Sequence, residues 1–338
     1  MPVRQDRHRL ATIEGMRITA LAGGIGGARF LRGLRDVLAE RQPTAEVTVI
    51  GNTADDIDLF GLRICPDLDS VMYTLGGGID EERGWGRADE GWRAKAELAA
   101  YGYGPEWFGL GDRDLATHLI RTQLRTAGYP LDQITEALCR RWQPGVRLLP
   151  MTNDRVETHV VIADDEAGTR AIHFQEWWVG HRASLPALDF QQIGATESRP
   201  APGVLEAIEQ ADLLLLPPSN PVVSIGAILS VPGISEALRR SSSPVVGVSP
   251  IIGGAPVRGM ADACLSAIGI ATDAAAVAVH YGPELLDGWV VASEDGPGAA
   301  GLPDEGIAVL SRDILMRTPQ QAADLARSTV EFAQGLRR

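Results

Sequence analysis

The sequence predicts an α/β fold with a mostly parallel, Rossmann-like sheet and a mainly helical insertion. Three observations support this prediction. Short apolar runs rich in Val, Ile and Leu recur along the chain, as in parallel strands that are buried on both faces. Between them lie segments whose apolar residues repeat every three or four positions, the pattern of helices that pack on such a sheet. Glycine and small polar residues directly follow several runs, where an open α/β sheet has its ligand crevice.

Length and charge narrow the possible functions. The chain has 338 residues and a net charge of −13 at pH 7. This length can bury a full core, so we expect an N-terminal extension at 1–15 and one α/β domain at 16–338, with a helical insertion at about 70–145. The acidic balance argues against a general nucleic-acid-binding protein, which would need a basic surface.

The apolar runs and the cysteines indicate in which cellular compartment the protein is expected. No apolar run is long enough to span a membrane, and the first fifteen residues lack the apolar core of a signal peptide. Cys65, Cys139 and Cys264 have no metal-ligand spacing and cannot all pair. We therefore expect free thiols and a cytoplasmic protein without membrane association.

A glycine-rich turn joins the first predicted strand, residues 18–22, to the first helix. Four of its five residues from 23 to 27 are glycines: Gly23, Gly24, Gly26 and Gly27. Glycine lets the backbone approach a ligand without a Cβ in the way, and the following helix offers N–H groups and its positive dipole end to a phosphate. The turn lacks the Lys and Ser/Thr of a P-loop and breaks the dinucleotide fingerprint. A tight structural turn is the alternative; the other loops favour phosphate binding.

Acidic residues follow the second predicted strand, residues 46–50, at the same edge of the sheet. The segments G-N-T-A-D-D and C-P-D-L-D place Asp55, Asp56, Asp67 and Asp69 in one short stretch. Carboxylates beside a phosphate loop repel one another unless a cation lies between them. Mg²⁺ suits such a site because it binds one or two carboxylates together with water and phosphate oxygens.

These acids divide into structural and functional candidates. Asp67 and Asp55 occupy positions that suit helix capping, and Asp58 suits a solvated position. Asp56 and Asp69 are the preferred pair for metal or substrate contact and for catalysis, and Asp55 is the third candidate metal ligand. Asp56 is also a candidate to accept the proton of a substrate hydroxyl, a role that the sequence does not separate from metal binding.

The helical region contains two more candidate sites. Trp85 and Trp92 either stack on a planar ligand or anchor a small helical subdomain. Further on, an apolar period predicts a helix with Asp112 or Asp114 as its N-cap. Its apolar residues are Leu115, Leu119, Ile120 and Leu124. His118 suits a hydrogen-bonded core position or a catalytic one equally, whereas Arg121 offers a cationic group for which capping or surface pairing is the alternative.

Strand patterns return at residues 146–149, 157–162 and 170–174. The last of these runs into H-F-Q-E-W-W, which puts polar groups beside two large rings. We favour a pocket for an aromatic ligand, formed by His173, Gln175, Glu176, Trp177 and Trp178. An amphipathic wall with satisfied polar tips is the alternative.

Two further strands end in small-residue loops. Residues 211–216 lead into P-P-S-N-P-V-V-S-I-G, which carries Ser219, Asn220 and Ser224 to the sheet edge, where they suit a phosphate, a base edge or simple N-capping. Residues 244–248 lead into a third loop, in which Arg258 could meet an anion. The remaining pieces read as a helix at 271–279, strands at 288–291 and 306–310, and a helix at 319–336.

Seven motifs in this order resemble one known family. They are A-G-G-I-G-G-A-R, N-T-A-D-D, C-P-D-L-D-S-V-M-Y-T-L, W-F-G-L-G-D-R-D-L-A-T-H-L, H-F-Q-E-W-W, P-P-S-N-P-V-V-S-I-G and S-P-I-I-G-G-A-P-V-R-G-M-A-D. From about Arg17 onward the chain resembles the transferases of coenzyme F-420 biosynthesis, known as CofD in archaea and FbiA in actinobacteria. The G-W-G, Y-G-Y-G-P-E-W-F-G-L and R-W-Q-P-G segments are most similar to the FbiA branch.

The resemblance implies a reaction and a set of site residues. The acceptor is the deazaflavin Fo (7,8-didemethyl-8-hydroxy-5-deazariboflavin), and the donor is a guanosine diphosphate ester of phosphoenolpyruvate or 2-phospholactate. The ribityl hydroxyl of Fo attacks the distal phosphorus and GMP leaves, with Mg²⁺ as cofactor and a homodimer as the usual assembly. Asp69 matches a contact to deazaflavin and metal, and Gly109 lies near a second deazaflavin contact, where relatives can carry a longer side chain. The positions that match the guanosine diphosphate site are Gly23, Gly24, Gly26, Gly27, Ser219, Asn220 and Ser224.

An alternative comes from another class of protein. A nucleotide-sugar-binding regulator of the YvcK type shares the opening glycine loop without known transfer chemistry. The aspartate pair and the G-D-R-D-L-A-T-H stretch favour the enzyme, because a binding module would not need its carboxylates. Direct phosphoryl transfer fits the absence of a Ser–His or Cys–His nucleophile pattern, since it depends on placement and charge neutralisation.

Overall fold

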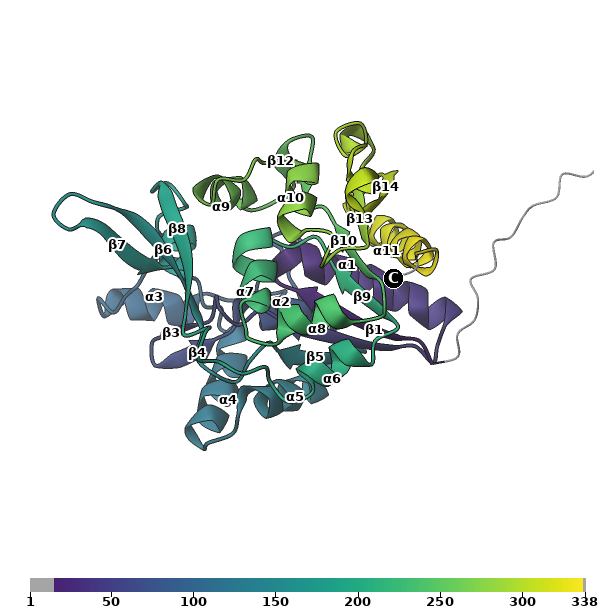
Figure 1. The fold of residues 1–338 in the computed structure, drawn as a ribbon. Coiled ribbons are helices and arrows are strands. Elements are labelled where there is room, and N and C mark those ends of the chain that lie inside the picture. The colour runs from purple at the N-terminus through teal and green to yellow at the C-terminus, as the bar shows by residue number, and fades with distance from the viewer. Residues whose placement is uncertain (1–14, 337–338) are drawn as a thin grey trace, which may run out of the picture.

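The computed structural model describes residues 15–336, and its centre is a seven-stranded sheet in the order β14-β13-β10-β9-β1-β2-β5 (Figure 1). All neighbouring strands in this sheet run parallel. The predicted α/β fold with a mostly parallel sheet is confirmed. The strands are β1 (Arg17–Ala22), β2 (Glu46–Gly51), β5 (Arg147–Pro150), β9 (Leu213–Leu216), β10 (Val245–Val248), β13 (Gly288–Ala292) and β14 (Ala308–Arg312).

Helices cover both faces of this sheet, because successive strand residues point to opposite sides. In β9, Leu214 and Leu216 join one apolar core, and Leu213 and Leu215 join the other. One face is covered by α1 (Gly24–Arg41) and α11 (Pro319–Gln334), which lie side by side (Figure 1). The other is covered by α6 (Val204–Glu209), α7 (Ala227–Leu229), α8 (Ile234–Arg240), α9 (Ala261–Ala267) and α10 (Ala274–Tyr281).

The strand order changes direction between β1 and β9. β2 and β5 extend the sheet on one side of this point, and β9, β10, β13 and β14 extend it on the other. A ligand crevice forms at such a switch point, outside the carboxyl ends of the strands. The glycine turn after β1 and the Ser219–Asn220 loop after β9 both end there.

The segment between β2 and β5 contains the expected helices. They are α2 (Pro66–Leu75), α3 (Arg93–Ala100), α4 (Asp114–Thr126) and α5 (Leu131–Trp142). A short hairpin of β3 (Ile57–Leu59) and β4 (Leu62–Ile64) precedes them, which the sequence did not predict.

A second, antiparallel sheet follows β5 and projects from one end of the molecule (Figure 1). Its order is β7-β6-β8, with β6 at Glu157–Asp164, β7 at Gly168–His173 and β8 at Ala187–Ile193. Side chains of β6 alternate between buried and less buried positions, as in a sheet with one covered face. Two of its strands were predicted, but β8 and the separation from the main sheet were not.

Short elements complete the chain. They are η1 (Glu176–Gly180), η2 (Pro221–Gly226), β11 (Ile251–Ile252), β12 (Ala255–Pro256), η3 (Ser293–Asp295) and η4 (Leu302–Glu305). The predicted N-terminal extension lies, except for Gly15, outside the described residues, and Met16 is buried in the core. All three cysteines are unpaired, as expected.

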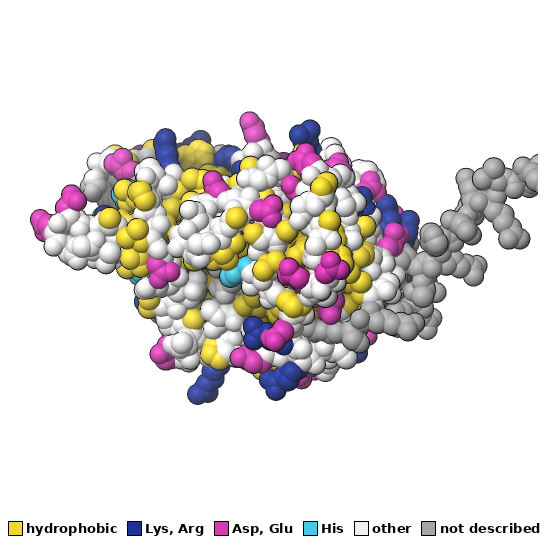
Figure 2. Space-filling view, turned by 45° about the horizontal axis from the view of Figure 1, so that its top comes forward, with side chains coloured by type: hydrophobic (Ala, Val, Ile, Leu, Met, Phe, Trp, Pro, Cys, Tyr) yellow, Lys and Arg dark blue, Asp and Glu magenta, His cyan; other side chains and the backbone are white. Residues whose placement is uncertain are grey.

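Surface charge and helix composition concern two functions that the sequence argued against, nucleic-acid binding and membrane association. On the face in Figure 2, Asp and Glu side chains are scattered among apolar and uncharged ones, without a broad basic patch among the described residues. Within residues 15–336, no single helix is long and apolar enough to cross a membrane. By length and composition alone, one pair of helices bent by 83°, Pro221–Leu229 with Ile234–Arg240, would pass that test jointly.

Candidate active site

Three predicted loops meet at the carboxyl edge of the main sheet. The Asp67 Oδ1 atom accepts a hydrogen bond from Gly24 N at 2.9 Å. The buried Asn52 amide donates to Asp67 Oδ2 at 2.9 Å and to the Val223 carbonyl at 3.2 Å. The loops after β1, β2 and β9 are therefore bonded into one unit.

The glycines of the first loop permit close packing between these loops. A Cβ on Gly26 would lie 2.3 Å from the Pro218 carbonyl oxygen, and one on Gly27 would lie 2.7 Å from Ser219 Oγ. Gly24 has φ of +66°, a left-handed conformation that favours glycine. Close packing and backbone conformation thus explain these glycines, as expected for a tight structural turn. Their contact with guanosine diphosphate stays a prediction.

Asp67 has a structural role that differs from the expected cap. Helix α2 has no side-chain cap at its start, so Asp67 does not cap its own helix. It bonds instead to the first N–H of α1, where a negative charge is favourable. Both of its oxygens have partners, which separates it from the other three acids.

Asp55, Asp56 and Asp69 are buried with incomplete hydrogen bonding. Within residues 15–336, no hydrogen bond reaches Asp55 Oδ1, either oxygen of Asp56, or Asp69 Oδ2. A buried carboxylate oxygen without a hydrogen bond is costly, so these atoms are suited to bind a proton or a cation. They belong to the three residues predicted as metal ligands.

A three-carboxylate metal site is not preassembled, however. No group of three Asp, Glu, His or Cys side chains among the described residues is placed to hold a metal ion. The expected set of Asp55, Asp56 and Asp69 therefore does not converge on one point. The donor set still fits Mg²⁺, which takes one or two carboxylates and completes its shell with water and phosphate oxygens.

Burial raises the pKa of each acid in this cluster. The pKa of Asp56 rises to about 7, with Arg63 as the main opposing influence, and that of Asp67 rises to about 6. Burial and repulsion from Asp67 raise the pKa of Asp55 well above its usual range. Burial also raises the pKa of Asp69 against the attraction of Arg121. Clustered acids with raised pKa values mark a candidate functional site.

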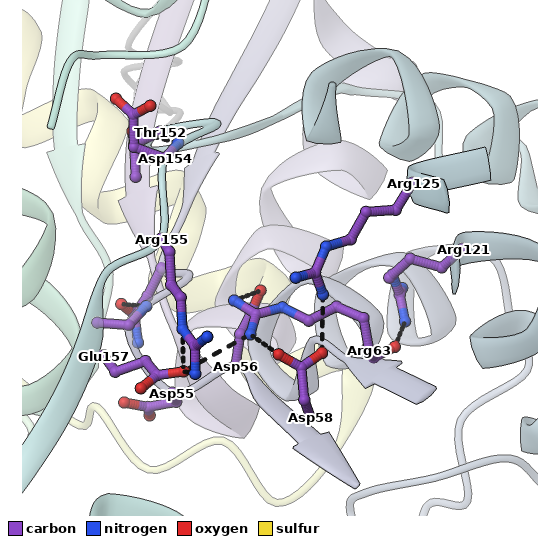
Figure 3. A network of polar contacts seen from close by, with 12 residues as sticks. Asp55, Asp56, Asp58, Arg63, Arg121, Arg125, Thr152, Asp154, Arg155 and Glu157 are labelled. Atoms are coloured by element: carbon purple, nitrogen blue, oxygen red, sulfur yellow. Dashed lines mark hydrogen bonds and ion pairs between the residues drawn. The ribbon is translucent and has the colours of Figure 1, made fainter. Parts of the chain in front are cut away.

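Arg63 joins three acids at the base of this cluster (Figure 3). Its guanidinium lies 3.4 Å from Asp56 Oδ2, 3.3 Å from Asp58 Oδ2 and 3.8 Å from Glu157 Oε1. Asp58, expected to be solvated, also pairs with Arg125 at 2.7 Å. Arg63 thereby connects the hairpin, the acidic turn and the second sheet.

Arg121 performs a similar role at Asp69. The two side chains form an ion pair through Asp69 Oδ1, and Arg121 Nη1 lies 3.1 Å from His118 Nδ1. His118 Nε2 lies 3.3 Å from Asp114 Oδ2. The other carboxylate oxygen of Asp114, Oδ1, accepts a hydrogen bond from the Tyr73 hydroxyl at 2.6 Å. His118 is thus held in the core by a buried polar chain that ends at Asp69.

The face of helix α4 that is buried is not the one predicted from its apolar residues. Leu119 and Ile120 are 56% and 48% exposed, whereas His118 and Arg121 are buried, because the polar face fills the charged site. The predicted caps are wrong as well. Arg113 is the N-cap residue, and Asp112 instead accepts from the first N–H groups of α3.

Side chains of the second sheet reach the acidic turn. His173 Nε2 and Gln175 Nε2 lie 3.2 Å from the carbonyl oxygens of Asp56 and Asp55 respectively. Trp177 is fully buried and donates to the Leu185 carbonyl at 2.7 Å. The predicted aromatic pocket is therefore wrong for Trp177, which packs in the core.

The loop after β9 is tied to the glycine turn. Ser219 Oγ donates to the Gly23 carbonyl at 2.9 Å. Asn220 Oδ1 caps η2, accepting from Val222 N at 2.9 Å. Ser224 is buried next to Gly23. The capping alternative for Asn220 is confirmed, and contacts of these residues with a nucleotide stay predictions.

Trp85 and Trp92 form an aromatic pair around Gly109. Their ring centroids are 6.2 Å apart, and the Arg83 guanidinium lies 5.6 and 5.4 Å from the two rings. A Cβ on Gly109 would lie 3.3 Å from Trp92 and 3.4 Å from Trp85. The pair fills the space of a longer side chain at Gly109, and Trp85 stays 43% exposed.

The sequence matches one family over most of its length. The sequence profile of the family described as 2-phospho-L-lactate transferase CofD matches residues 18–303. The chain belongs to the CofD family. The predicted membership of this transferase family of coenzyme F-420 biosynthesis is confirmed, and so is the class of enzyme.

Similar proteins place the chain on one branch of the family. A phosphoenolpyruvate transferase of Thermobifida fusca is 62% identical over 326 residues, covering 95% of this chain and 99% of the relative. Those of Streptomyces coelicolor and Nocardia farcinica are 60% and 57% identical, covering 95% and 96% of this chain and 99% and 97% of the relatives. The predicted FbiA branch is confirmed.

Solved structures agree on the fold. A protein of the UPF0052 family from Bacillus halodurans has a TM-score of 0.61 and covers 94% of this chain, with 99% of its own length aligned. Its sequence is 17% identical, so the likeness concerns the fold alone.

Sequence reasoning missed several residues that organise the site. Asn52 stands directly after β2 in the N-T-A-D-D motif, and this strand-end position was a usable signal. No such signal pointed to Arg63, because it lies on a three-residue strand without a recognisable hydrophobic period. His173 and Gln175 were noticed but assigned to a pocket.

Proposed function

We propose that the chain is a Mg²⁺-dependent transferase that moves a phosphoenolpyruvyl group from its guanosine diphosphate ester to Fo. A 2-phospholactyl group is the second candidate for the transferred group. The products are GMP and coenzyme F-420-0, in its dehydro form when enolpyruvate is transferred. The observation that carries this proposal is the group of buried carboxylate oxygens without hydrogen-bond partners, next to loops joined at the sheet's switch point.

The names of the relatives favour the enolpyruvyl donor. The three actinobacterial relatives described above are all named phosphoenolpyruvate transferases and align over nearly their full length. At 57–62% identity, a shared donor is the simplest expectation. A homodimer, implied by the family resemblance, and the cytoplasmic location expected from the cysteines are part of the same proposal.

The proposed transfer forms one phosphorus–oxygen bond and breaks another. The ribityl oxygen of Fo attacks the distal phosphorus, the bond to the bridging oxygen breaks, and GMP leaves with that oxygen. The proton of the hydroxyl goes to Asp56, because a carboxyl with a pKa of about 7 both accepts and releases protons near neutral pH.

Charge neutralisation and placement supply the rest of the catalysis. A bound Mg²⁺ held by Asp69 with Asp55 or Asp56 would neutralise charge on the diphosphate. Arg121 and Arg63 hold Asp69 and Asp56 in place from behind. The loops after β1 and β9 are proposed to hold the guanosine diphosphate part through Gly23, Gly24, Gly26, Gly27, Ser219, Asn220 and Ser224.

The acceptor side is proposed from the same resemblance. Asp69 and the region around Gly109 would contact the deazaflavin. The exposed Trp85 ring next to Gly109 offers a planar surface of suitable chemistry.

Mass spectrometry of the product tests the proposal. The protein is incubated with Fo, Mg²⁺ and either the enolpyruvyl or the lactyl guanosine diphosphate ester. We expect the mass of dehydro coenzyme F-420-0 with the first, together with GMP, and no product in excess chelator. Asp69→Ala should fold and lose this turnover. Binding of a nucleotide sugar without product from either donor would support the regulator instead.

A further inference from the structure

The second sheet holds three consecutive carbonyl groups of the acidic turn. Thr158 N donates to the Ala54 carbonyl at 2.6 Å. The Gln175 amide donates to the Asp55 carbonyl at 3.2 Å, and His173 Nε2 lies 3.2 Å from the Asp56 carbonyl. Residues 54–56 are therefore fixed along their backbone by β6, by the last residue of β7 and by the residue before η1, all outside the main sheet.

The His173 ring has one hydrogen-bonding arrangement. Its Nδ1 atom accepts from Gln175 N at 3.1 Å, so the ring hydrogen sits on Nε2 and is donated to Asp56. Burial lowers the pKa of His173, which favours the neutral ring that this arrangement needs. His173 and Gln175 thus act as a pair, which we call the carbonyl clamp.

The clamp holds peptide groups whose side chains are buried but have few hydrogen bonds. Because a peptide unit is planar, fixing the carbonyls of Asp55 and Asp56 restricts the directions of their Cα–Cβ bonds. Asp55 Oδ1 and both Asp56 oxygens have no hydrogen bond of their own in the described chain. Arg63 pairs with Asp56 at 3.4 Å but does not hold Asp55. The backbone contacts therefore help to direct both carboxylates, together with Arg63 at Asp56.

We propose that His173 and Gln175 are positioning residues, which aim the carboxylates of Asp55 and Asp56 through their backbone carbonyls. This inference rests on the proposed function. It assigns the H-F-Q-E-W-W motif to the acidic turn rather than to a ligand pocket. Partners that orient metal ligands commonly change metal affinity or activity 10- to 100-fold when removed.

Variants that remove one donor test the clamp. Gln175→Met and His173→Phe keep side-chain size without donating to the carbonyls, and His173→Gln keeps a donor. The matched control is Gln191→Met, at an exposed position of the same sheet. Readouts are Mn²⁺ affinity by electron paramagnetic resonance, kcat with saturating donor, and GDP affinity in chelator.

We expect a pattern that a general structural defect would not give. Gln175→Met and His173→Phe should weaken Mn²⁺ binding about tenfold and lower kcat about 10- to 100-fold. GDP affinity should stay within about twofold, because its proposed contacts lie on the loops after β1 and β9. His173→Gln and Gln191→Met should resemble the wild type in all three.

Other outcomes separate the clamp from the proposed function. Unchanged Mn²⁺ affinity and kcat in Gln175→Met would overturn the clamp, as would a His173→Gln variant no better than His173→Phe. If His173→Phe does not fold, the Gln175→Met measurements decide. A wild type that binds Mn²⁺ but forms no product would overturn the proposed function, and the Mn²⁺ affinities would still decide the clamp.

Discussion

The acidic cluster contains two kinds of carboxylate, which differ in their hydrogen bonds. Asp67 has a partner on each oxygen and links α1 to the loop after β2. Asp56 is buried without a hydrogen bond on either oxygen. The sequence predicted that some of these acids are structural and others functional. Asp67 does have a structural role, and the functional roles of Asp56 and Asp69 stay predictions. The sequence could not predict which atoms Asp67 bonds, because that depends on where α1 starts in space.

Asp56→Asn should remove the proposed proton acceptor. We expect kcat to fall about 10²- to 10⁴-fold while the protein stays folded. In the wild type, Asp56 is ionised only above its pKa of about 7, so kcat should fall as the pH drops through 7. The variant should lose this acidic limb. A flat wild-type profile from pH 6 to 8, measured by GMP release, would speak against Asp56 as the acceptor.

Gly26→Ala should disturb packing rather than only a ligand. The added Cβ would lie 2.3 Å from the Pro218 carbonyl oxygen, so one of the two loops must move. Overpacking of this kind costs about 1–3 kcal/mol of unfolding free energy. Gly301→Ala is the matched control, because nothing lies within 4 Å of its Cβ position and its φ is −84°.

Thermal melting and GDP calorimetry measure both effects of Gly26→Ala. We expect the melting temperature and GDP affinity to fall together in this variant and neither to change in the control. Weaker GDP binding at an unchanged melting temperature would mean that Gly26 acts on the ligand directly.

At the scale of elements, the parallel strands and long helices were the predictable part. The β9 run Leu-Leu-Leu-Leu is fully buried, and such a run has few alternatives to a central strand. β8 was missed because its sequence, Ala-Leu-Asp-Phe-Gln-Gln-Ile, mixes polar and apolar residues around one buried Phe190. α4 was found, but its orientation was not, since its buried face is polar.

The orientation of α4 predicts a large effect on stability at one of its residues and almost none at another. Arg121→Leu should remove about 3–5 kcal/mol of unfolding free energy, because it leaves Asp69 buried without its partner. Leu119→Gln should change the unfolding free energy by less than about 0.5 kcal/mol, since Leu119 is 56% exposed. Urea titrations measure both. A larger loss in Leu119→Gln than in Arg121→Leu would contradict the burial of this helix.

At the scale of the whole molecule, the sequence predicted that separate loops meet at one edge. The hydrogen bonds of Asn52 and Asp67 join the loops after β1, β2 and β9, as expected from strand ends in a parallel sheet. The contribution of the second sheet was not predictable. It depends on His173 and Thr158 reaching the acidic turn from strands that do not belong to the main sheet.

The acidic cluster should make the metal-free protein less stable at higher pH. Asp56 and Asp67 have folded-state pKa values of about 7 and 6, above the ordinary value of 3.8. The folded state therefore holds protons that the unfolded state releases, and this stabilisation is lost as pH rises through 6 and 7. In chelator, we expect the melting temperature to be lower by about 5 °C or more at pH 8 than at pH 5.

Mg²⁺ should reverse this loss, and more at pH 8 than at pH 5, because it replaces the protons. Scanning calorimetry with and without Mg²⁺, with KCl at matched ionic strength as the control, measures both trends. A melting temperature that rises from pH 5 to 8 in chelator would contradict the raised pKa values. An equal effect of KCl would argue against a specific cation.

The contact between Gly26 and Pro218 limits how this enzyme can be redesigned. Because the Pro218 carbonyl oxygen lies 2.3 Å from where a Cβ on Gly26 would be, the two loops leave no room for a larger side chain at this position. An engineer who wants a different substrate preference should leave residues 23–27 unchanged and vary residues outside this loop. Directed-evolution libraries that leave these residues unchanged should retain more folded members.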